Sequence, residues 1–220
     1  MASRQQVKEF FEKYGPIAVE LCAGSGVFPS VALAQAALET GYAVSKPYNN
    51  MFGHKAPSGW TGKVYSTTTR EHLNGKDVVF KGTGKAYPNR VAAIKDGANV
   101  QTIFKAYDTE KDAWKDYVSL IKRRFSKALQ AANPFEQIKA IKDGGYATGA
   151  KYVEDVSSII RSNQLEDWDK KKSSKRIGRN KAKWLAVAAI VAVTAIIILL
   201  VWKRKKIIEK LKTIKILNKK

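Results

Sequence analysis

Glu39 is the residue whose position in the sequence best suits catalytic chemistry. It follows an apolar stretch, residues 31–38, and directly precedes Thr40-Gly41, a pair that predicts the end of a helix. The negative end of a helix dipole and apolar surroundings both raise the pKa of a carboxyl group, and a raised pKa suits a general acid. The alternative is an exposed glutamate at a helix end, and position alone favours that alternative.

The elements around this carboxyl group follow from hydrophobic periodicity and capping residues. Ser3 and Gln6 form a capping-box pattern, so a first helix is expected to begin there and to end at Gly15-Pro16. Pro16 then suits the first turn of a second helix, as Pro29 suits the first turn of a third. Helices are therefore expected over residues 3–15, 17–23, 29–40, 108–121, 135–141 and 152–160.

A small β-lobe is expected between the helices. Two stretches of β-forming residues, Val64–Thr69 and His72–Phe80, predict two strands of a hairpin around an Asn74-Gly75 turn, which lies near the start of the second stretch. Residues 81–100 follow without a clear pattern and are expected to form a loop beside the cleft. The fold class is therefore mainly α, a helical domain with a small β-hairpin lobe.

Four blocks of sequence carry a resemblance to a known family. Any one of them would be a weak signal, but all four occur in the family's order. Together they closely resemble the glucosaminidase domains of glycoside hydrolase family 73, which are relatives of the lysozyme-like hydrolases. The blocks are residues 29–42 (PSVALAQAALETGY), 49–56 (NNMFGHKA), 104–108 (FKAYD) and 144–152 (GGYATGAKY).

The resemblance implies an α+β lysozyme-like fold and an endo-β-N-acetylglucosaminidase. Such an enzyme hydrolyses the β-1,4 bond on the reducing side of N-acetylglucosamine in peptidoglycan. Glu39 matches the family's catalytic acid, which protonates the leaving oxygen as an oxocarbenium-like transition state develops. Peptidoglycan glycan strands are therefore the expected substrate.

The second catalytic group stays open at this point. Glu71 matches the position of a hairpin-lobe carboxylate in many family members, where it would act as base or nucleophile. The alternative is an exposed strand glutamate paired with Arg70 or Lys63. A carboxylate with room for a water favours inversion, whereas the acetamido group of the substrate could replace it and favour retention.

The same resemblance assigns further residues to the cleft. Tyr146 matches an active-site tyrosine that orients the acetamido group or stabilises charge; a core tyrosine is the alternative. His54 stands where the family usually has isoleucine, and a satisfied core histidine is again the alternative. A core position is also the alternative for Phe52. The residues expected to bind the glycan are Gln35, Tyr42, Asn50, Phe52, His54, Trp60 and Tyr152, with Tyr48 and Tyr87 as further stacking platforms.

Positive charge is concentrated at the C-terminal end of the sequence. The net charge is +21, of which residues 1–169 contribute +5 and residues 170–220 contribute +16. We therefore expect one catalytic domain, residues 1–169, and a basic appendage. The lysines of the appendage flank an apolar span. Binding of these lysines to lipid headgroups explains this arrangement, so no nucleic-acid partner is expected.

Residues 184–202 are uncharged and have tryptophan at both ends. As a helix they would be about 28 Å long, which matches the hydrocarbon core of a bilayer, and tryptophan favours the interfaces. The alternative, a buried core helix, rarely lacks a polar face over about five turns. A basic linker at 170–183, a transmembrane helix at 184–202 and a basic tail at 203–220 are therefore expected, with the lipid bilayer as a partner.

The tail and the orientation of the span allow more than one interpretation. Ile207–Leu217 is typical of an amphipathic helix on anionic lipid, and a solvated lysine tail is the alternative. Basic runs lie on both sides of the span, so charge does not set its orientation, and no signal peptide is visible. The expected localisation is the membrane, single-pass, with the catalytic domain destined for the wall side, either inserted outward or held at the cytoplasmic face until lysis.

Cysteine and histidine usage argues against a disulfide and a metal site. Cys22 is the single cysteine, which excludes an intrachain disulfide and suits a small buried hydrophobe. His54 and His72 have no cysteine partner nearby and make a poor metal set. No cofactor and no metal are expected.

Two classes of function compete on these observations. The first is a membrane-anchored peptidoglycan hydrolase, with a phage or prophage lysis role as its narrower form. The second is a non-catalytic, membrane-anchored protein that binds the cell wall and retains the fold. Release of reducing ends from purified walls separates the two.

Overall fold

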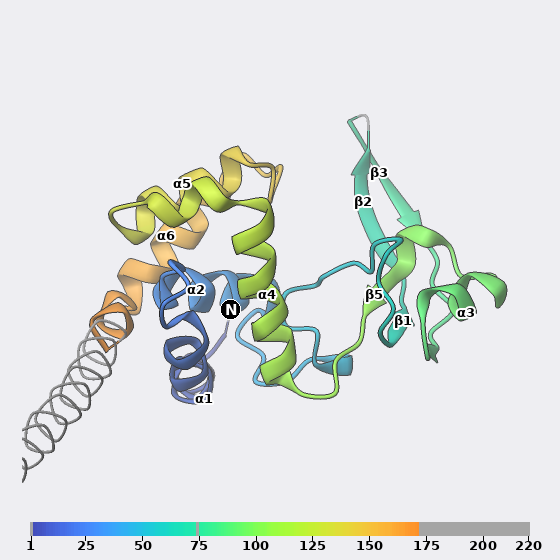
Figure 1. The fold of residues 1–220 in the computed structure, drawn as a ribbon, viewed down its shortest axis with the longest axis horizontal. Helices are drawn as coiled ribbons and strands as arrows, with labels where there is room; N and C mark the ends of the chain where they lie inside the picture. Colours follow the sequence, from blue (N-terminus) through green and yellow to red (C-terminus); the bar gives the residue numbers. More distant parts are fainter. Residues whose placement is uncertain (1, 74, 172–220) are drawn as a thin grey trace, which may run out of the picture. The chain divides into compact units, whose positions relative to one another are not determined.

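The computed structural model describes residues 2–73 and 75–171 (Figure 1). The expected membrane span, the basic tail and nearly all of the expected linker lie outside these residues and stay predictions. Within the described ranges, no helix combines the length and the apolar character needed to cross a membrane. The helices are α1 (Arg4–Cys22), α2 (Pro29–Thr40), η1 (Pro47–Asn49), α3 (Arg90–Lys95), η2 (Val100–Thr102), α4 (Glu110–Arg124), η3 (Ser126–Gln130), α5 (Pro134–Asp143) and α6 (Tyr152–Ser162). The strands are β1 (Val64–Ser66), β2 (Thr69–Leu73), β3 (Lys76–Phe80), β4 (Ala86–Tyr87) and β5 (Ile103–Lys105).

Helix α2 is the central element of the helical part. Residues 29–37 are all buried, and α1, α5 and α6 pack against this helix (Figure 1). A helix that is apolar on every side must be surrounded by protein, which explains why the expected helix forms here. Pro29 occupies its first turn and Gly41, with φ of 60°, ends it in the left-handed conformation, so both expected boundaries are confirmed.

Residue Asp169 connects the C-terminal end of the described chain to the start of α2. Its carboxylate accepts hydrogen bonds from the main-chain nitrogen of Ser30 at 2.9 Å and from Ser30 Oγ at 2.6 Å. An anion is favourable there because the first main-chain N–H groups of a helix have no partner within the helix. The helix that carries the candidate acid is thus held at its other end.

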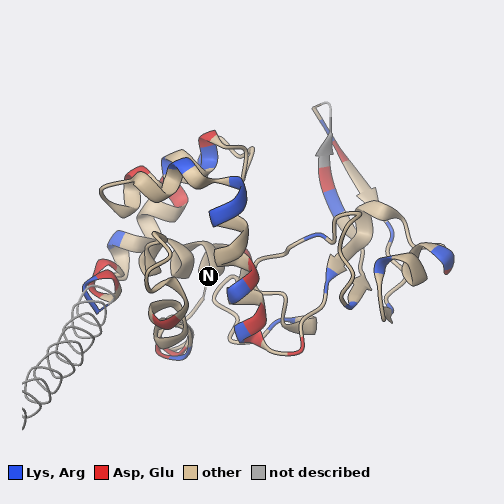
Figure 2. Ribbon diagram, in the orientation of Figure 1, with Lys and Arg blue, Asp and Glu red and all other residues tan. Residues whose placement is uncertain are grey.

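The main core is rich in aromatic rings. Phe10 and Tyr14 from α1, and Trp114 and Tyr117 from α4, are fully buried. Their spacing of three or four residues places each pair on one face of its helix. Cys22 is buried, as expected for a small apolar residue. Lys, Arg, Asp and Glu are spread over several helices and strands and mixed in sign (Figure 2).

The strands form two small antiparallel sheets. The order in the first sheet is β4-β1-β5, and the second is the β2–β3 hairpin, with Glu71 opposite Val78. A separate small core lies under the first sheet; its buried members are Ala56, Val64, Ala93, Ala98 and Ile103. Gly75 has φ of 76°, which suits the expected tight turn at the tip of the hairpin.

The expected break at Gly15-Pro16 is wrong, because α1 runs on through both residues. The capping box of Ser3 and Gln6 is confirmed, but Pro16 lies inside the helix. The helix continues because its second half has a buried face of its own. Gly15 provides space there: a Cβ atom on it would lie 2.4 Å from the ring of Trp168.

Two further expectations for the β-lobe need correction. The first strand of the hairpin is β2, whereas Val64–Ser66 pairs with β4 and β5 in the other sheet. Two residues without regular structure, Thr67 and Thr68, separate the two strands, and local sequence patterns do not show which strand is the partner. Residues 81–100, expected as a loop, contain β4 and α3 instead.

Candidate active site

The carboxyl group of Glu39, in the last turn of α2, faces the segment that follows η1. A Cβ atom built on Gly53 would lie 3.9 Å from Glu39 Oε2, so the main chain at Gly53 passes close to the carboxylate. Gly53 has φ of 60°, a conformation that glycine adopts without strain. The lack of a side chain at this position leaves space in front of the candidate acid.

The environment of Glu39 favours its protonated form. Burial raises the pKa of the Glu39 carboxyl above its ordinary value, and the positive charge of Lys46 offsets part of that rise. The side chain is nevertheless solvent-exposed, so a glycan can reach it. A carboxyl group that keeps its proton at higher pH and remains accessible has the two properties that a general acid needs.

Two tyrosines lie within electrostatic range of Glu39. Burial raises the pKa of Tyr146 and of Tyr152, and the negative charge of Glu39 adds to the rise in both. Their ring centroids are 6.0 Å apart. Both phenols therefore stay protonated at any physiological pH and can donate a hydrogen bond near the carboxyl group.

Gln35 lies one helical turn before Glu39 and is fully buried. Its amide nitrogen donates to the hydroxyl of Tyr152, and its carbonyl oxygen accepts from the hydroxyl of Tyr117. The amide is thus occupied within the protein. Gln35 therefore holds Tyr152 in place rather than offering its amide to a glycan, which differs from the expected substrate contact.

Four other expected glycan-binding residues are also buried, namely Asn50, Phe52, His54 and Tyr152. Asn50 is 2% exposed, and its side chain accepts from the main-chain nitrogen of His54 at 2.9 Å and donates to the oxygen of His54 at 3.0 Å. Phe52 is 3% exposed and stacks on Tyr117, with ring centroids 4.2 Å apart. For Phe52 the core position, left open by the sequence, is the one observed.

Tyr42 and Trp60 are both partly exposed and pack differently. The ring of Tyr42 packs edge-on against Phe10 and Phe11 of α1, each at 5.9 Å between centroids. Trp60 is partly exposed, and its indole nitrogen donates to the main-chain oxygen of Lys63 at 3.0 Å. Lys105 Nζ lies over the Trp60 ring at 4.4 Å from its centroid, so both aromatic side chains are partly covered by the protein.

Glu71 lies on β2 and forms an ion pair with Lys55, whereas the sequence suggested Arg70 or Lys63 as its partner. Lys55 Nζ donates to Glu71 Oε1 at 2.6 Å, and Thr69 Oγ1 donates to the same oxygen at 2.9 Å. The bond from Lys55 lowers the pKa of the Glu71 carboxyl below its ordinary value; partial burial opposes the shift and the bond from Thr69 adds to it. Glu71 is therefore held ionised, whereas the environment of Glu39 favours the protonated form.

A concavity contains the expected stacking residue Tyr48 together with Lys46 and Tyr65, which sequence reasoning missed. The rings of Tyr48 and Tyr65 stack there with centroids 4.5 Å apart, and Tyr48 is 40% exposed. Flat aromatic faces of this kind suit the C–H faces of sugar rings. The alternation of a strand could have indicated that Tyr65 faces away from its two buried neighbours and toward solvent. No sequence pattern indicated a role for Lys46. The concavity measures about 270 Å³ and is lined by Lys46, Pro47, Tyr48, Asn50, Tyr65, Ser66, Thr67 and Gly84.

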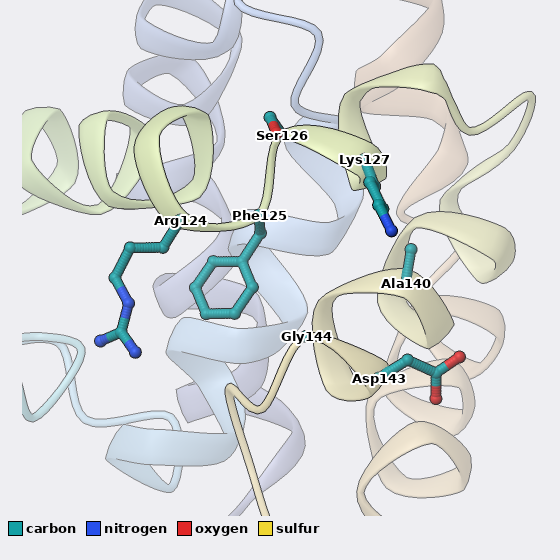
Figure 3. Close-up of a pocket in the computed structure, with 7 residues that line it drawn as sticks. All are labelled: Arg124, Phe125, Ser126, Lys127, Ala140, Asp143 and Gly144. Atoms are coloured by element: carbon teal, nitrogen blue, oxygen red, sulfur yellow. The ribbon is translucent and has the colours of Figure 1, made fainter.

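A larger cavity of about 460 Å³ lies at the C-terminal ends of α4 and α5 (Figure 3). It does not include Glu39 or any of the expected glycan-binding residues. Its link to the candidate site is Phe125, whose ring contacts Tyr146 edge-on at 5.6 Å. The lining residues are Arg124, Phe125, Ser126, Lys127, Ala140, Asp143 and Gly144.

The described side chains offer no cluster of three His, Cys, Asp or Glu residues that could hold a metal ion. The candidate site itself presents the carboxyl group of Glu39 and the phenols of Tyr146 and Tyr152. An accessible carboxylic acid with a raised pKa can protonate the leaving oxygen of a glycoside. Together with the helical fold and its small sheets, this defines a lysozyme-like glycoside hydrolase.

Comparison with known proteins narrows this class to a family. A family model described as mannosyl-glycoprotein endo-beta-N-acetylglucosaminidase matches residues 15–165. The chain therefore belongs to the glucosaminidase family, as the four sequence blocks indicated.

Individual relatives are similar over the same region. Peptidoglycan hydrolase FlgJ of Escherichia coli K12 is 31% identical over 146 residues, which cover 62% of this chain and 40% of that protein. Exo-glucosaminidase LytG of Bacillus subtilis is 27% identical over 146 residues, or 65% of this chain and 46% of that protein. The glycoside hydrolase domain of Salmonella typhimurium FlgJ, solved in a C-terminally truncated form, superposes with a TM-score of 0.52 at 28% identity, covering 72% of this chain and 97% of that one. The chain thus spans less than half the length of these two curated relatives.

Proposed function

We propose that this chain is a peptidoglycan hydrolase that cleaves the β-1,4 bond on the reducing side of N-acetylglucosamine, with Glu39 as general acid. The observation that carries the proposal is a solvent-accessible carboxyl group with a raised pKa at the end of the buried helix α2. Membership of the glucosaminidase family supports the reaction, and similarity to proteins named peptidoglycan hydrolase and exo-glucosaminidase supports the substrate class.

In the proposed reaction Glu39 transfers its proton to the glycosidic oxygen as the sugar ring gains oxocarbenium character. Lys46 limits the rise in the pKa of Glu39 and stabilises the carboxylate once the proton has left. Tyr146, which is partly exposed, donates a hydrogen bond at the same place, to the acetamido group or to the new carboxylate, and the buried Tyr152 packs beside it.

Glu71 is the proposed second carboxylate. An ionised carboxylate suits a base that activates water or a nucleophile that attacks the anomeric carbon, and the hydrogen bonds from Lys55 and Thr69 keep Glu71 ionised. The acetamido group of the substrate is the competing nucleophile. In that case Glu71 serves in binding alone.

The function is tested on purified cell walls with the full-length protein. Wild type is expected to release reducing ends of N-acetylglucosamine, whereas Glu39→Gln is expected to release almost none. Lys139→Gln is the control, because Lys139 forms an exposed ion pair with Asp143 on α5. Reducing ends of N-acetylmuramic acid would reassign the bond, and wild type that binds walls without releasing product would leave the non-catalytic alternative.

The mode of cleavage is proposed as internal. Fragment sizes from long glycan strands test this point, since an endo enzyme first releases fragments of mixed length. An exo enzyme, as LytG is named, releases short units from one end. A product mixture dominated by one short unit from the start would contradict the endo mode.

Membrane anchoring is proposed from the sequence of residues 184–202 alone. An uncharged span with tryptophan at both ends and basic flanks is typical of a single transmembrane helix. A phage or prophage lysis role follows if the catalytic domain is held at the cytoplasmic face until lysis. Protease added to intact cells tests the placement, because digestion of the domain would show that it is already outside.

A further inference from the structure

Three consecutive residues, 53 to 55, lie next to both carboxyl groups of the candidate site, those of Glu39 and Glu71. Gly53 passes close to Glu39 Oε2, and Lys55 Nζ lies 2.6 Å from Glu71 Oε1. His54, between them, has its imidazole ring buried in the protein. The position of this short segment therefore determines the surroundings of both carboxyl groups at once.

His54 fixes the segment through its side chain and its main chain. Its Nδ1 lies 3.0 Å from Asp116 Oδ2 on α4, and its ring stacks on Phe52 with centroids 5.6 Å apart. The main-chain oxygen of His54 accepts from the main-chain nitrogen of Lys105 at 2.9 Å. One residue thus ties the segment to α4 on one side and to β5 on the other.

Asp116 is the centre of this buried network. Besides His54, its Oδ2 accepts from Lys105 Nζ at 2.8 Å and from the hydroxyl of Tyr107 at 2.7 Å. Burial alone would raise the pKa of Asp116, but the bonds from His54, Lys105 and Tyr107 hold it well below its usual range. The carboxylate is therefore charged and keeps two donors even without the imidazole.

The second ring nitrogen of His54 has an unusual environment. Nε2 is buried and has no hydrogen-bond partner among the described residues. Buried polar atoms without partners destabilise a fold, and an apolar side chain would avoid that cost. Stability of the core therefore does not explain the histidine, whereas its bond to Asp116 fixes the position of residues 53–55.

We propose that His54 and Asp116 are positioning residues that hold residues 53–55 and thereby set the surroundings of Glu39 and Glu71. The inference rests on the catalytic roles given to these two carboxyl groups in the proposed function. His54 itself does not contact the substrate, because its ring is buried. It acts through Gly53 on the general acid and through Lys55 on the second carboxylate.

The test compares His54→Leu with His54→Asn in the full-length protein. Leucine fills the space and removes the bond to Asp116, whereas the amide of asparagine keeps a polar group near the position of Nδ1. We expect His54→Leu to lower kcat about 10- to 100-fold with little change in KM, since displacing positioned groups mainly affects the chemical step. His54→Asn is expected to recover most of the loss.

The pH dependence of kcat/KM supplies the readout that a purely structural role would not move. The charged or titratable groups around Glu39 are Lys46, Tyr146 and Tyr152, and His54→Leu changes none of them. A looser segment admits water to Glu39 and lowers its pKa, so the alkaline limb is expected to move to lower pH.

Two outcomes would overturn the inference. If His54→Leu keeps wild-type kcat and pH profile while its melting temperature is equal or higher, the histidine has no positioning role. The same holds if both variants lose activity in proportion to a lower melting temperature and the alkaline limb stays in place. Wild type that releases no product would instead refute the proposed function, and Lys139→Gln provides the wild-type-like reference in all cases.

Discussion

A general acid must hold its proton at the pH of the reaction and still be reached by its substrate. Glu39 meets the first condition because burial raises the pKa of its carboxyl group, and the second because its side chain is exposed at the end of α2. Glu71 has the opposite environment, since Lys55 holds it ionised. Two carboxyl groups with pKa values shifted in opposite directions are what an acid and its partner base or nucleophile require.

Replacement of Glu71 by glutamine separates the possible mechanisms. We expect Glu71→Gln to lower turnover by about two orders of magnitude or more, because the amide can neither accept a proton nor attack the sugar. The anomer released first, measured by NMR, assigns the role: inversion indicates a base and retention a nucleophile. A loss below about tenfold would instead indicate the acetamido group of the substrate.

The ion pair of Glu71 predicts a pH effect of known sign. Because Lys55 lowers the pKa of Glu71, activity should persist to lower pH than for an ordinary glutamate, and it should fall as pH drops through that lowered pKa. Lys55→Met removes the donor and the charge, so the acid limb of kcat/KM should move to higher pH. Lys63→Met, which removes an exposed pair with Asp108, is the control. An acid limb that stays in place in Lys55→Met would show that Glu71 does not set it.

At the scale of elements, the main chain at Gly82, after β3, lies very close to the main chain at Thr67, before β2. A Cβ atom on Gly82 would lie 2.3 Å from the main-chain carbon of Thr67, just before β2, so a side chain cannot be accommodated without moving the strand. We expect Gly82→Ala to lower the free energy of unfolding by about 1–3 kcal/mol, measured by denaturant titration.

Gly59→Ala is the matched control, because nothing lies within 4 Å of a Cβ atom at that position. It should change stability by less than about 0.5 kcal/mol. Equal effects of the two substitutions would contradict the close approach at Gly82.

Sequence patterns predicted the helices better than the strands. Periodicity and caps located α2, α4, α5 and α6, because each helix has a buried face set by its own residues. Pro16 was misjudged because a buried face outweighs one lost hydrogen bond. Strand partners were misassigned because pairing depends on residues far away in the sequence.

The same limit applies to the candidate site. Glu39 was singled out at its helix end and proposed as the acid from the family motifs. Other polar side chains of those motifs are buried in the structure and contact the protein interior. Gln35 and Asn50 are conspicuous polar residues in those blocks, yet both are buried and bonded within the protein. Sequence position does not show whether a polar side chain faces the cleft or the core.

At the scale of the whole molecule, charge and apolar character are divided along the sequence. The domain, residues 1–169, carries a modest positive charge, while the appendage combines an apolar span with a charge of +16. Attraction to anionic walls and lipid headgroups is the expected result of this charge.

Anchoring through residues 184–202 predicts a fractionation result. Val193→Arg combined with Ile196→Arg places two charges at the centre of the span, each costing about 2.5–3.5 kcal/mol for insertion. Wild type should remain in carbonate-washed membranes, whereas the double variant should be recovered largely in the soluble fraction. Val193→Leu is the control, and equal retention of all three proteins would contradict anchoring by this span.

The most direct test of the account is turnover of purified peptidoglycan by Glu39→Gln. Glutamine keeps the size and most hydrogen bonds of the side chain but has no transferable proton, so the melting temperature should be nearly unchanged. We expect turnover to fall by about two to four orders of magnitude. Wild-type turnover in a correctly folded Glu39→Gln protein would contradict the assignment of Glu39 and, with it, the proposed active site.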